Sequence, residues 1–161
     1  MKNPLILVIL GCCSVALSSC LSPEVPNPPA ASLENLMLSS YHENEMIQTW
    51  EIGSLIQEQS NLTLNNVIFN DIDSMSLEAD YLQIFLEKKQ WDGQNVHLKL
   101  KNNSEISIQS NFFTYNGLSK LALFTDQVLL INDSMHIRAN SLEYNSLNDT
   151  MRLIDVGGST S

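Results

Sequence analysis

Two stretches of the chain, SMSLEADYL at residues 74–82 and SMHIRANSL at residues 134–142, share their first two residues, their alanine and their final leucine. A third stretch, IQSNFF at residues 108–113, lies midway between them. All three fit the pattern Leu/Ile, any residue, Ala/Ser, Asp/Asn, any residue, Leu/Phe, followed two residues later by Ile84, Tyr115 or Tyr144. A period of about thirty residues predicts one supersecondary unit stacked on copies of itself.

A second element alternates with the first. Its copies are VIF at residues 67–69, VHL at 96–98 and VLL at 128–130, and Val156 begins a fourth. A third element, YNGL at residues 115–118, returns as YNSL at 144–147. Because the three elements recur in the same order, we interpret them as a repeat and not as chance similarity.

The repeated units have the period of β-strands. Apolar and polar residues alternate at residues 94–100 and 106–110, which places every second side chain on one face, and we assign Leu121 and Leu123 to the same pattern. We therefore predict an all-β protein of nine or ten strands with little helix. Strands of that number joined by hairpins predict a folded-over antiparallel sheet, or a sandwich, with an apolar interior.

Turn signals divide the strands. Asn116–Gly117 and Asp92–Gly93 are predicted to be hairpin turns, because these residue types tolerate positive φ. Residues 36–41 and 46–56 are predicted to form a further hairpin. Residues 77–89 also satisfy helical spacing, but their alignment with the other two copies favours a strand.

The N-terminus has the features of a targeting segment. A lysine, an apolar stretch over residues 4–16 and the sequence LSSC at residues 17–20 resemble the lipobox of bacterial lipoproteins. That resemblance implies cleavage after residue 19 and acylation of Cys20. An ordinary secretory signal, an uncleaved anchor and cleavage before Cys12 are the alternatives, although the last leaves an apolar region of only about eight residues.

The remaining boundaries follow from composition. Residues 20–32 contain four of the five prolines and are predicted to form an extended tether behind the lipidated cysteine. The folded domain is then residues 33–156, and residues 157–161 form a flexible tail.

Charge and motifs exclude several functions. The chain has 161 residues and a net charge of -10, so it lacks the basic surface that binds nucleic acid. His42, His97 and His136 show no metal-ligand or catalytic spacing, and no phosphate-binding glycine loop is present. We therefore expect neither an enzyme nor a cofactor or metal site.

The residues carry a family resemblance. The N-terminal hairpin ending in WEI at residues 50–52, the spacing of Leu64, Val67 and Phe69, and the repeated units closed by Tyr-Asn are similar to the LptC/LptA/OstA-like proteins of lipopolysaccharide export. The resemblance covers residues 36–156. It implies an open β-jellyroll whose groove receives lipid acyl chains, and sheet edges that pair with neighbouring copies of the fold.

The same resemblance implies a role and partners. The chain looks like a lipoprotein variant of LptC, held in the periplasm by lipidated Cys20 and relaying lipopolysaccharide from an inner-membrane export ABC transporter to an LptA-like β-jellyroll protein. The family favours the inner membrane, whereas Leu21 after the cysteine leaves the outer membrane possible. The competing hypothesis is a structural or assembly lipoprotein whose closed sandwich binds a protein and carries no lipid.

Two sets of residues follow from the resemblance and the strand pattern. Lipid contact is assigned to the large residues of the repeat face, namely Phe69, Leu82, Ile84, Leu98, Phe113, Tyr115, Leu123, Leu130, Leu142 and Tyr144. The last strand ends close to the C-terminus, and an unprotected terminal strand can pair with a partner by β-augmentation. That partner edge contains Met151, Leu153 and Val156.

Overall fold

The computed structural model describes residues 31–43, 45–72, 74–101 and 105–156, and its regular structure is entirely β. The prediction of an all-β fold is confirmed. None of the described residues belongs to a helix long and apolar enough to cross a membrane. The nine strands are β1 (Ala31–His42), β2 (Glu45–Glu58), β3 (Asn61–Asp71), β4 (Met75–Phe85), β5 (Gln90–Leu100), β6 (Ile106–Asn116), β7 (Leu121–Asn132), β8 (Met135–Asn145) and β9 (Thr150–Val156).

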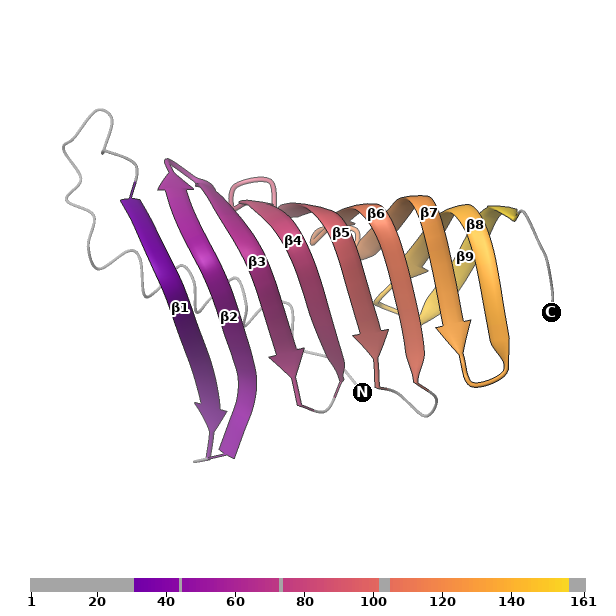
Figure 1. Ribbon diagram of the computed structural model, residues 1–161, viewed down its shortest axis with the longest axis horizontal. Coiled ribbons are helices and arrows are strands. Elements are labelled where there is room, and N and C mark those ends of the chain that lie inside the picture. Colours follow the sequence, from indigo (N-terminus) through magenta and orange to yellow (C-terminus); the bar gives the residue numbers. More distant parts are fainter. Residues whose placement is uncertain (1–30, 44, 73, 102–104, 157–161) are drawn as a thin grey trace.

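The strands form one antiparallel sheet in sequence order (Figure 1). Among the described residues β1 pairs with β2 alone and β9 with β8 alone, so these two strands are the edges. The predicted hairpin at residues 36–56 is confirmed as β1 and β2, although β1 begins at Ala31, inside the predicted tether. Cys20, the rest of the tether before residue 31 and the tail at residues 157–161 lie outside the described residues.

The order of buried and exposed residues in β4 shows how the sheet folds. Ala79 and Leu82 are both buried, whereas Asp80 between them is exposed. Side chains of a straight strand alternate, so two buried residues three positions apart require the strand to turn a corner. The same step separates Ser110 from Phe113 in β6. The repeated Ala/Ser, Asp/Asn, any residue, Leu/Phe sequence is therefore the corner itself.

The odd-numbered strands turn the same corner with left-handed backbone conformations. Asn35, Asn66 and Asn95 each have φ of 51°, and Asp155 has φ of 53°. In β7 two residues, at 126 and 127, have φ of 61° and 56°, where the pairing with β8 shifts register. Asn and Asp tolerate this conformation better than other residues with a side chain. This row of residues is the fold line of the sheet.

Side-chain hydrogen bonds join neighbouring strands along the fold line. The amide of Asn95 donates to the carboxylate of Asp80 at 2.8 Å, and the amide of Asn111 donates to Asp126 at 2.9 Å. These bonds connect β4 to β5 and β6 to β7. The Asp/Asn positions of the repeat thus link adjacent corners.

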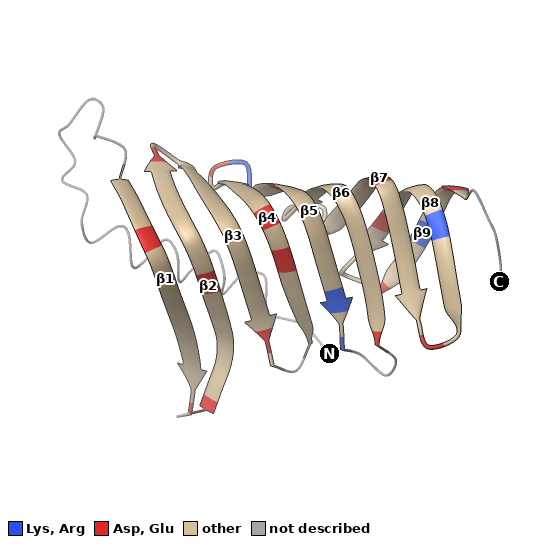
Figure 2. Cartoon of the chain, viewed as in Figure 1, with Lys and Arg blue, Asp and Glu red and all other residues tan. Residues whose placement is uncertain are grey.

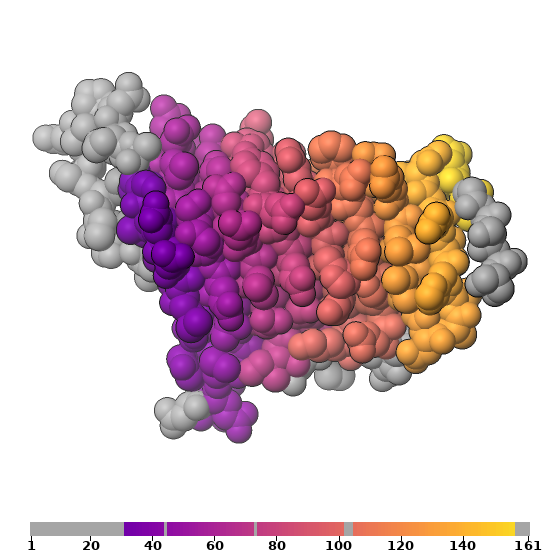
Figure 3. All heavy atoms as spheres, in the orientation of Figure 1, coloured from indigo at the N-terminus to yellow at the C-terminus, as the bar shows by residue number. Residues whose placement is uncertain are grey.

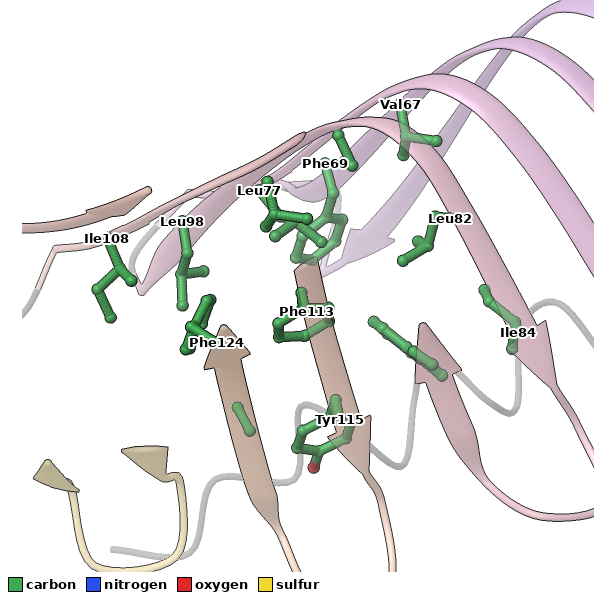
Figure 4. Close-up of a cluster of buried hydrophobic side chains, with 14 of the residues drawn as sticks. Val67, Phe69, Leu77, Leu82, Ile84, Leu98, Ile108, Phe113, Tyr115 and Phe124 are labelled. Atoms are coloured by element: carbon green, nitrogen blue, oxygen red, sulfur yellow. The ribbon is translucent and has the colours of Figure 1, made fainter. Parts of the chain in front are cut away.

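The fold line divides the sheet into two walls that face each other. Wall A contains the strand halves that end at the turns of residues 59–60, 86–89, 117–120 and 146–149, which we call turn row A. Wall B contains the other halves, and turn row B comprises the described residues 43, 72, 74, 101, 105 and 133–134. Figure 4 shows Phe69, Leu77 and Leu98 of wall B and Phe113 and Tyr115 of wall A in the space between the walls.

The turn predictions need correction. Asp92–Gly93 is not a turn but lies within β5, and a Cβ on Gly93 would be 2.9 Å from Val96 Cγ2 and 3.3 Å from Phe113 Cδ1. The glycine is needed because the interior is crowded there. Residues 77–85 are in a strand, as predicted, and the turn that follows them is at residues 86–89.

Asn116–Gly117 does lie at a hairpin, but the predicted positive φ at both residues is wrong. Among the described residues of that turn, the left-handed one is Lys120, with φ of 60°. The amide of Gly117 donates to the carbonyl of Lys89 at 2.7 Å, and a Cβ on Gly117 would lie 2.9 Å from that oxygen. Close contact with the preceding turn, and not backbone freedom, explains this glycine.

Candidate functional site

The space between the walls is filled with apolar side chains. Phe69, Leu82 and Leu142 have no exposed surface, and the most exposed of the buried apolar residues, Trp50 and Tyr144, are 8% exposed. Most of the residues assigned to lipid contact point into this interior. They are Phe69, Leu82, Ile84, Leu98, Phe113, Tyr115, Leu142 and Tyr144, all buried, together with the half-buried Leu130. Their contact with lipid stays a prediction.

The assignment of Leu123 to the interior is wrong. Leu123 is 38% exposed on the outer face of wall A, whereas its neighbours Ala122 and Phe124 are buried. All four residues from 121 to 124 are apolar, so the sequence there has no period-two signal to identify the inner face.

Two tryptophans that the sequence analysis did not assign to the interior connect the two walls. Trp50 of wall B and Trp91 of wall A meet edge to face, with ring centroids 6.3 Å apart. Trp50 also packs against Phe69 at 4.5 Å, and Trp91 against Tyr115 at 5.8 Å. Strand pairing could have located both residues, because Trp50 pairs with Phe69 and Trp91 with Tyr115 in the register of the sheet.

The interior reaches solvent at the β1 end of the sheet. Leu33 and Leu38 of β1 pair with Leu55 and Trp50 of β2, whose side chains are in the core. Residues opposite each other on neighbouring strands share a face, so both leucines belong to the inner face. They are nevertheless 45% and 42% exposed, because no described strand covers β1 on its other side.

The interior is polar at its boundary with turn row B. Asp71 and Gln48 are buried there, and the Gln48 amide donates to Asp71 Oδ2 at 3.1 Å. The backbone amide and the hydroxyl of Ser74 donate to Asp71 Oδ1 at 3.1 and 2.8 Å. A carboxyl group therefore marks this end of the apolar interior.

Two tyrosines mark the boundary with turn row A. The Tyr144 hydroxyl donates to Asp149 at 2.8 Å, and burial, followed by this hydrogen bond, raises the pKa of Tyr144. Burial also raises the pKa of Tyr115, against a smaller opposite effect of Ser146. Within the described residues the Tyr115 hydroxyl forms no hydrogen bond of ordinary geometry. Both phenols are neutral at physiological pH.

A separate hollow of about 850 Å³ lies on the outer face of wall B, near the fold line. Its lining includes His97, Gln109, Asn111 and Arg138 from β5, β6 and β8. Burial, then Lys99, lowers the pKa of His97 against the opposing effect of Glu78. Figure 3 shows the strands following one another in sequence order across one face of the molecule. The hollow, which is also lined by Val96, Val128 and Leu129, shares none of the residues assigned to lipid contact.

The described residues contain no group of three or more His, Cys, Asp or Glu side chains placed to hold a metal ion.

Comparisons with known proteins identify a family and a similar solved structure. The model of a family described as OstA-like protein matches residues 45–160. Among solved structures the chain is similar to LptH from Pseudomonas aeruginosa, described as the LptA-homologous periplasmic component of the lipopolysaccharide transport device. That similarity has a TM-score of 0.36 and 10% identity, over 81% of this chain and 85% of LptH. The comparison with curated protein sequences finds no match.

Proposed function

Because the chain belongs to the OstA-like protein family, we propose that it is a periplasmic component of lipopolysaccharide transport that receives acyl chains between its two walls. One observation supports this proposal above the others. The two walls enclose a continuous apolar interior, and at the β1 end its inward-facing Leu33 and Leu38 are exposed to solvent.

The interior offers enough apolar surface to hold a lipid by its tails alone. Burial of one methylene is worth about 0.8 kcal/mol, so a chain of about twelve carbons gains roughly 9 kcal/mol before entropic costs. This fits an acidic protein with a net charge of -10, which cannot rely on a generally basic surface to attract phosphates. Such a carrier moves lipid without breaking bonds.

Entry of an acyl chain requires the walls to separate. The side chains between them fill the space, and the Trp50–Trp91 contact holds the walls together near the β1 side. We infer that an acyl chain enters at the β1 end, where Leu33 and Leu38 of the inner face are exposed to solvent, and displaces this aromatic contact. The energy gained by burying the tail offsets the loss of the ring contact, which is worth about 0.5–1.5 kcal/mol.

The sheet edges suit the transfer of lipid to a neighbour. In β9 the residues Met151, Leu153 and Val156 lie in a strand with no described partner on its outer side. We propose that this edge pairs with an LptA-like β-jellyroll protein by β-augmentation, so that the apolar interiors join. An inner-membrane export ABC transporter would deliver lipid at the other end, in the manner of LptC.

Membrane attachment is the other part of the proposal. Acylated Cys20 would hold the domain on a membrane, because two or more acyl chains give essentially permanent attachment. We expect Cys20→Ala to produce a folded protein that leaves the membrane fraction on cell fractionation. If the variant remains in that fraction, the anchor is elsewhere.

A second candidate function is favoured by the degree of burial. An interior with several residues at 0% exposure also suits a sealed sandwich that acts as a structural or assembly lipoprotein and binds only protein. The two candidates differ in whether any interior residue contacts lipid.

Adjacent phenylalanines provide a matched test. Phe113 is 6% exposed in the interior, whereas Phe112 is 50% exposed on the outer face. We expect a benzophenone amino acid at position 113 to crosslink to lipopolysaccharide in cells, and the same residue at position 112 to crosslink much less. Equal yields at both positions, or no adduct from position 113 in folded protein, would favour the sealed scaffold.

A further inference from the structure

Turn row A has an unusual combination of exposed leucines and lysines. Leu118 and Leu147 occupy the same place in successive turns and are 70% and 80% exposed, and among the exposed large apolar residues Met37 of β1, at 71%, is similarly exposed. Lys88, Lys89 and Lys120 lie in the same row. These three are a large share of the eight basic residues in the whole chain.

Backbone hydrogen bonds make turn row A a continuous edge. The amide of Leu86 donates to the carbonyl of Ser60 at 3.0 Å, and that of Gly117 to the carbonyl of Lys89 at 2.7 Å. The amide of Ser146 donates to the carbonyl of Lys120 at 3.0 Å. Each turn therefore rests on the one before it, and their side chains are held in a fixed relation.

The lysines of this row are free to meet an anion. Within the described part of the chain none of the three forms an ion pair, and Lys88 lies over the ring of Phe85 at 5.3 Å from its centroid. Three acidic residues, Glu58, Glu87 and Asp149, also lie at or beside this row, and Asp149 accepts a hydrogen bond from Tyr144. Glu87 is the acidic residue next to the lysines in sequence.

Turn row B is more acidic: four carboxylates there accompany one described lysine, whereas in turn row A three carboxylates accompany three lysines. Glu43, Glu45, Glu105 and Asp133 lie at or beside its turns, and Figure 2 shows these acidic positions at the ends of the wall B strands. The one lysine described there, Lys101, directs its ammonium group toward the carbonyl oxygens of Asp71 and Ile72, at 3.4 and 3.5 Å. The buried carboxyl group of Asp71 lies just inside this row.

The headgroup of an anionic lipid between the walls should therefore prefer one turn row to the other. We propose that turn row A receives the phosphate groups of the lipid whose acyl chains occupy the interior, with Lys88, Lys89 and Lys120 against the phosphates and Leu118 and Leu147 against the first methylenes. This inference rests on the proposed function and adds an orientation to it. The opposite orientation would bring the phosphates to the carboxylates of turn row B, where like charges repel.

The lysine contribution can be measured with the full chain and two probes, lipid A and chemically dephosphorylated lipid A. Exposed charge pairs are weak singly, and three of them together predict that wild type binds the phosphorylated form about tenfold more tightly. The variant K88Q/K89Q/K120Q should bind both forms with the affinity that wild type has for the dephosphorylated one.

A control variant of equal charge separates local contact from net charge. Lys99 and Arg138 are in wall B and Lys101 is in turn row B, so K99Q/K101Q/R138Q removes three positive charges away from turn row A. It should keep the preference for the phosphorylated form. Loss of the preference in the control as well, or its survival in K88Q/K89Q/K120Q, would overturn the inference.

Two further results distinguish the alternatives. If wild type binds neither form of lipid A, the proposed carriage itself fails. If it binds both forms equally, only the inferred orientation fails. Should K88Q/K89Q/K120Q lose binding to phosphatidylglycerol vesicles while keeping the preference for phosphorylated lipid A, turn row A contacts a bilayer surface and the inference is wrong.

Discussion

At the fold line glycine should be more stabilising than alanine, which is the opposite of the order expected in an ordinary strand. Asn66 has φ of 51° in β3, and its side chain is exposed. We compare Asn66→Gly with Asn66→Ala. Alanine in the left-handed region costs about 1–2 kcal/mol, whereas glycine adopts it freely and loses only about 0.5–1 kcal/mol of backbone entropy relative to alanine. The glycine variant should therefore be the more stable of the two, by about 0.5–1 kcal/mol.

Ile68 provides the control, two residues further along the same strand. It is 40% exposed and is not among the described residues with positive φ. Ile68→Ala and Ile68→Gly both lose all side-chain atoms beyond Cβ, so the difference between them reports mainly the backbone. Here alanine should be the more stable, by about 0.5–1 kcal/mol.

Urea unfolding followed by tryptophan fluorescence measures all four variants. Trp50 and Trp91, the two tryptophans of the chain, are buried between the walls, so their emission reports separation of the walls. The slope of free energy against urea should stay constant while the midpoint moves. If alanine is more stable than glycine at position 66 as well, β3 does not bend there and the account of the two walls fails.

Further predictions concern packing and pH. Gly93→Ala should lower the free energy of unfolding by about 1–3 kcal/mol, because the new Cβ would lie 2.9 Å from Val96 Cγ2. Adding Val96→Ala should recover part of that loss in a double-mutant cycle, and strictly additive effects would contradict this contact. Phe124→Ala should cost about 3–5 kcal/mol in urea unfolding, and Leu123→Ala less than about 0.5 kcal/mol, since only Phe124 is buried; similar losses would place both residues on one face. Because burial lowers the pKa of His97 from 6.5, the unfolded chain binds a proton first, so stability should fall as pH drops below about 6.5. Urea midpoints at about pH 7.5 and about pH 5.5 should show a smaller decline for His97→Gln than for wild type, and an equal decline would mean that His97 does not contribute.

Most of the fold could be predicted from the repeat in the sequence. The recurrence of Ala79-Asp80 and Ser110-Asn111 at fixed positions was enough to predict strands of similar length in sequential order. It did not reveal the fold line, because an exposed Asp or Asn in a strand is also compatible with ordinary solvent exposure. The fold line is marked by two buried residues three positions apart, such as Ala79 and Leu82. In a search for strict alternation of apolar and polar residues, this spacing looks like an irregularity.

The site was less predictable than the fold. Tyr115 and Tyr144 were assigned to the interior because the repeat fixes their positions, and both are buried. Trp91 was overlooked because the adjacent Asp92–Gly93 resembled a turn, a local signal that interior packing overrides. The contrast between the two turn rows depends on which hairpins lie at the same end of the sheet, and overall composition does not report this.

Quenching of the two tryptophans by a brominated acyl chain tests the central claim most directly. Trp50 and Trp91 lie in the interior with ring centroids 6.3 Å apart, one on each wall, so a tail between the walls must come within quenching range. We predict that a twelve-carbon fatty acid brominated along its chain quenches the fluorescence saturably, whereas the unbrominated acid binds without quenching. Binding of the brominated acid with no loss of tryptophan emission would contradict an interior that carries lipid.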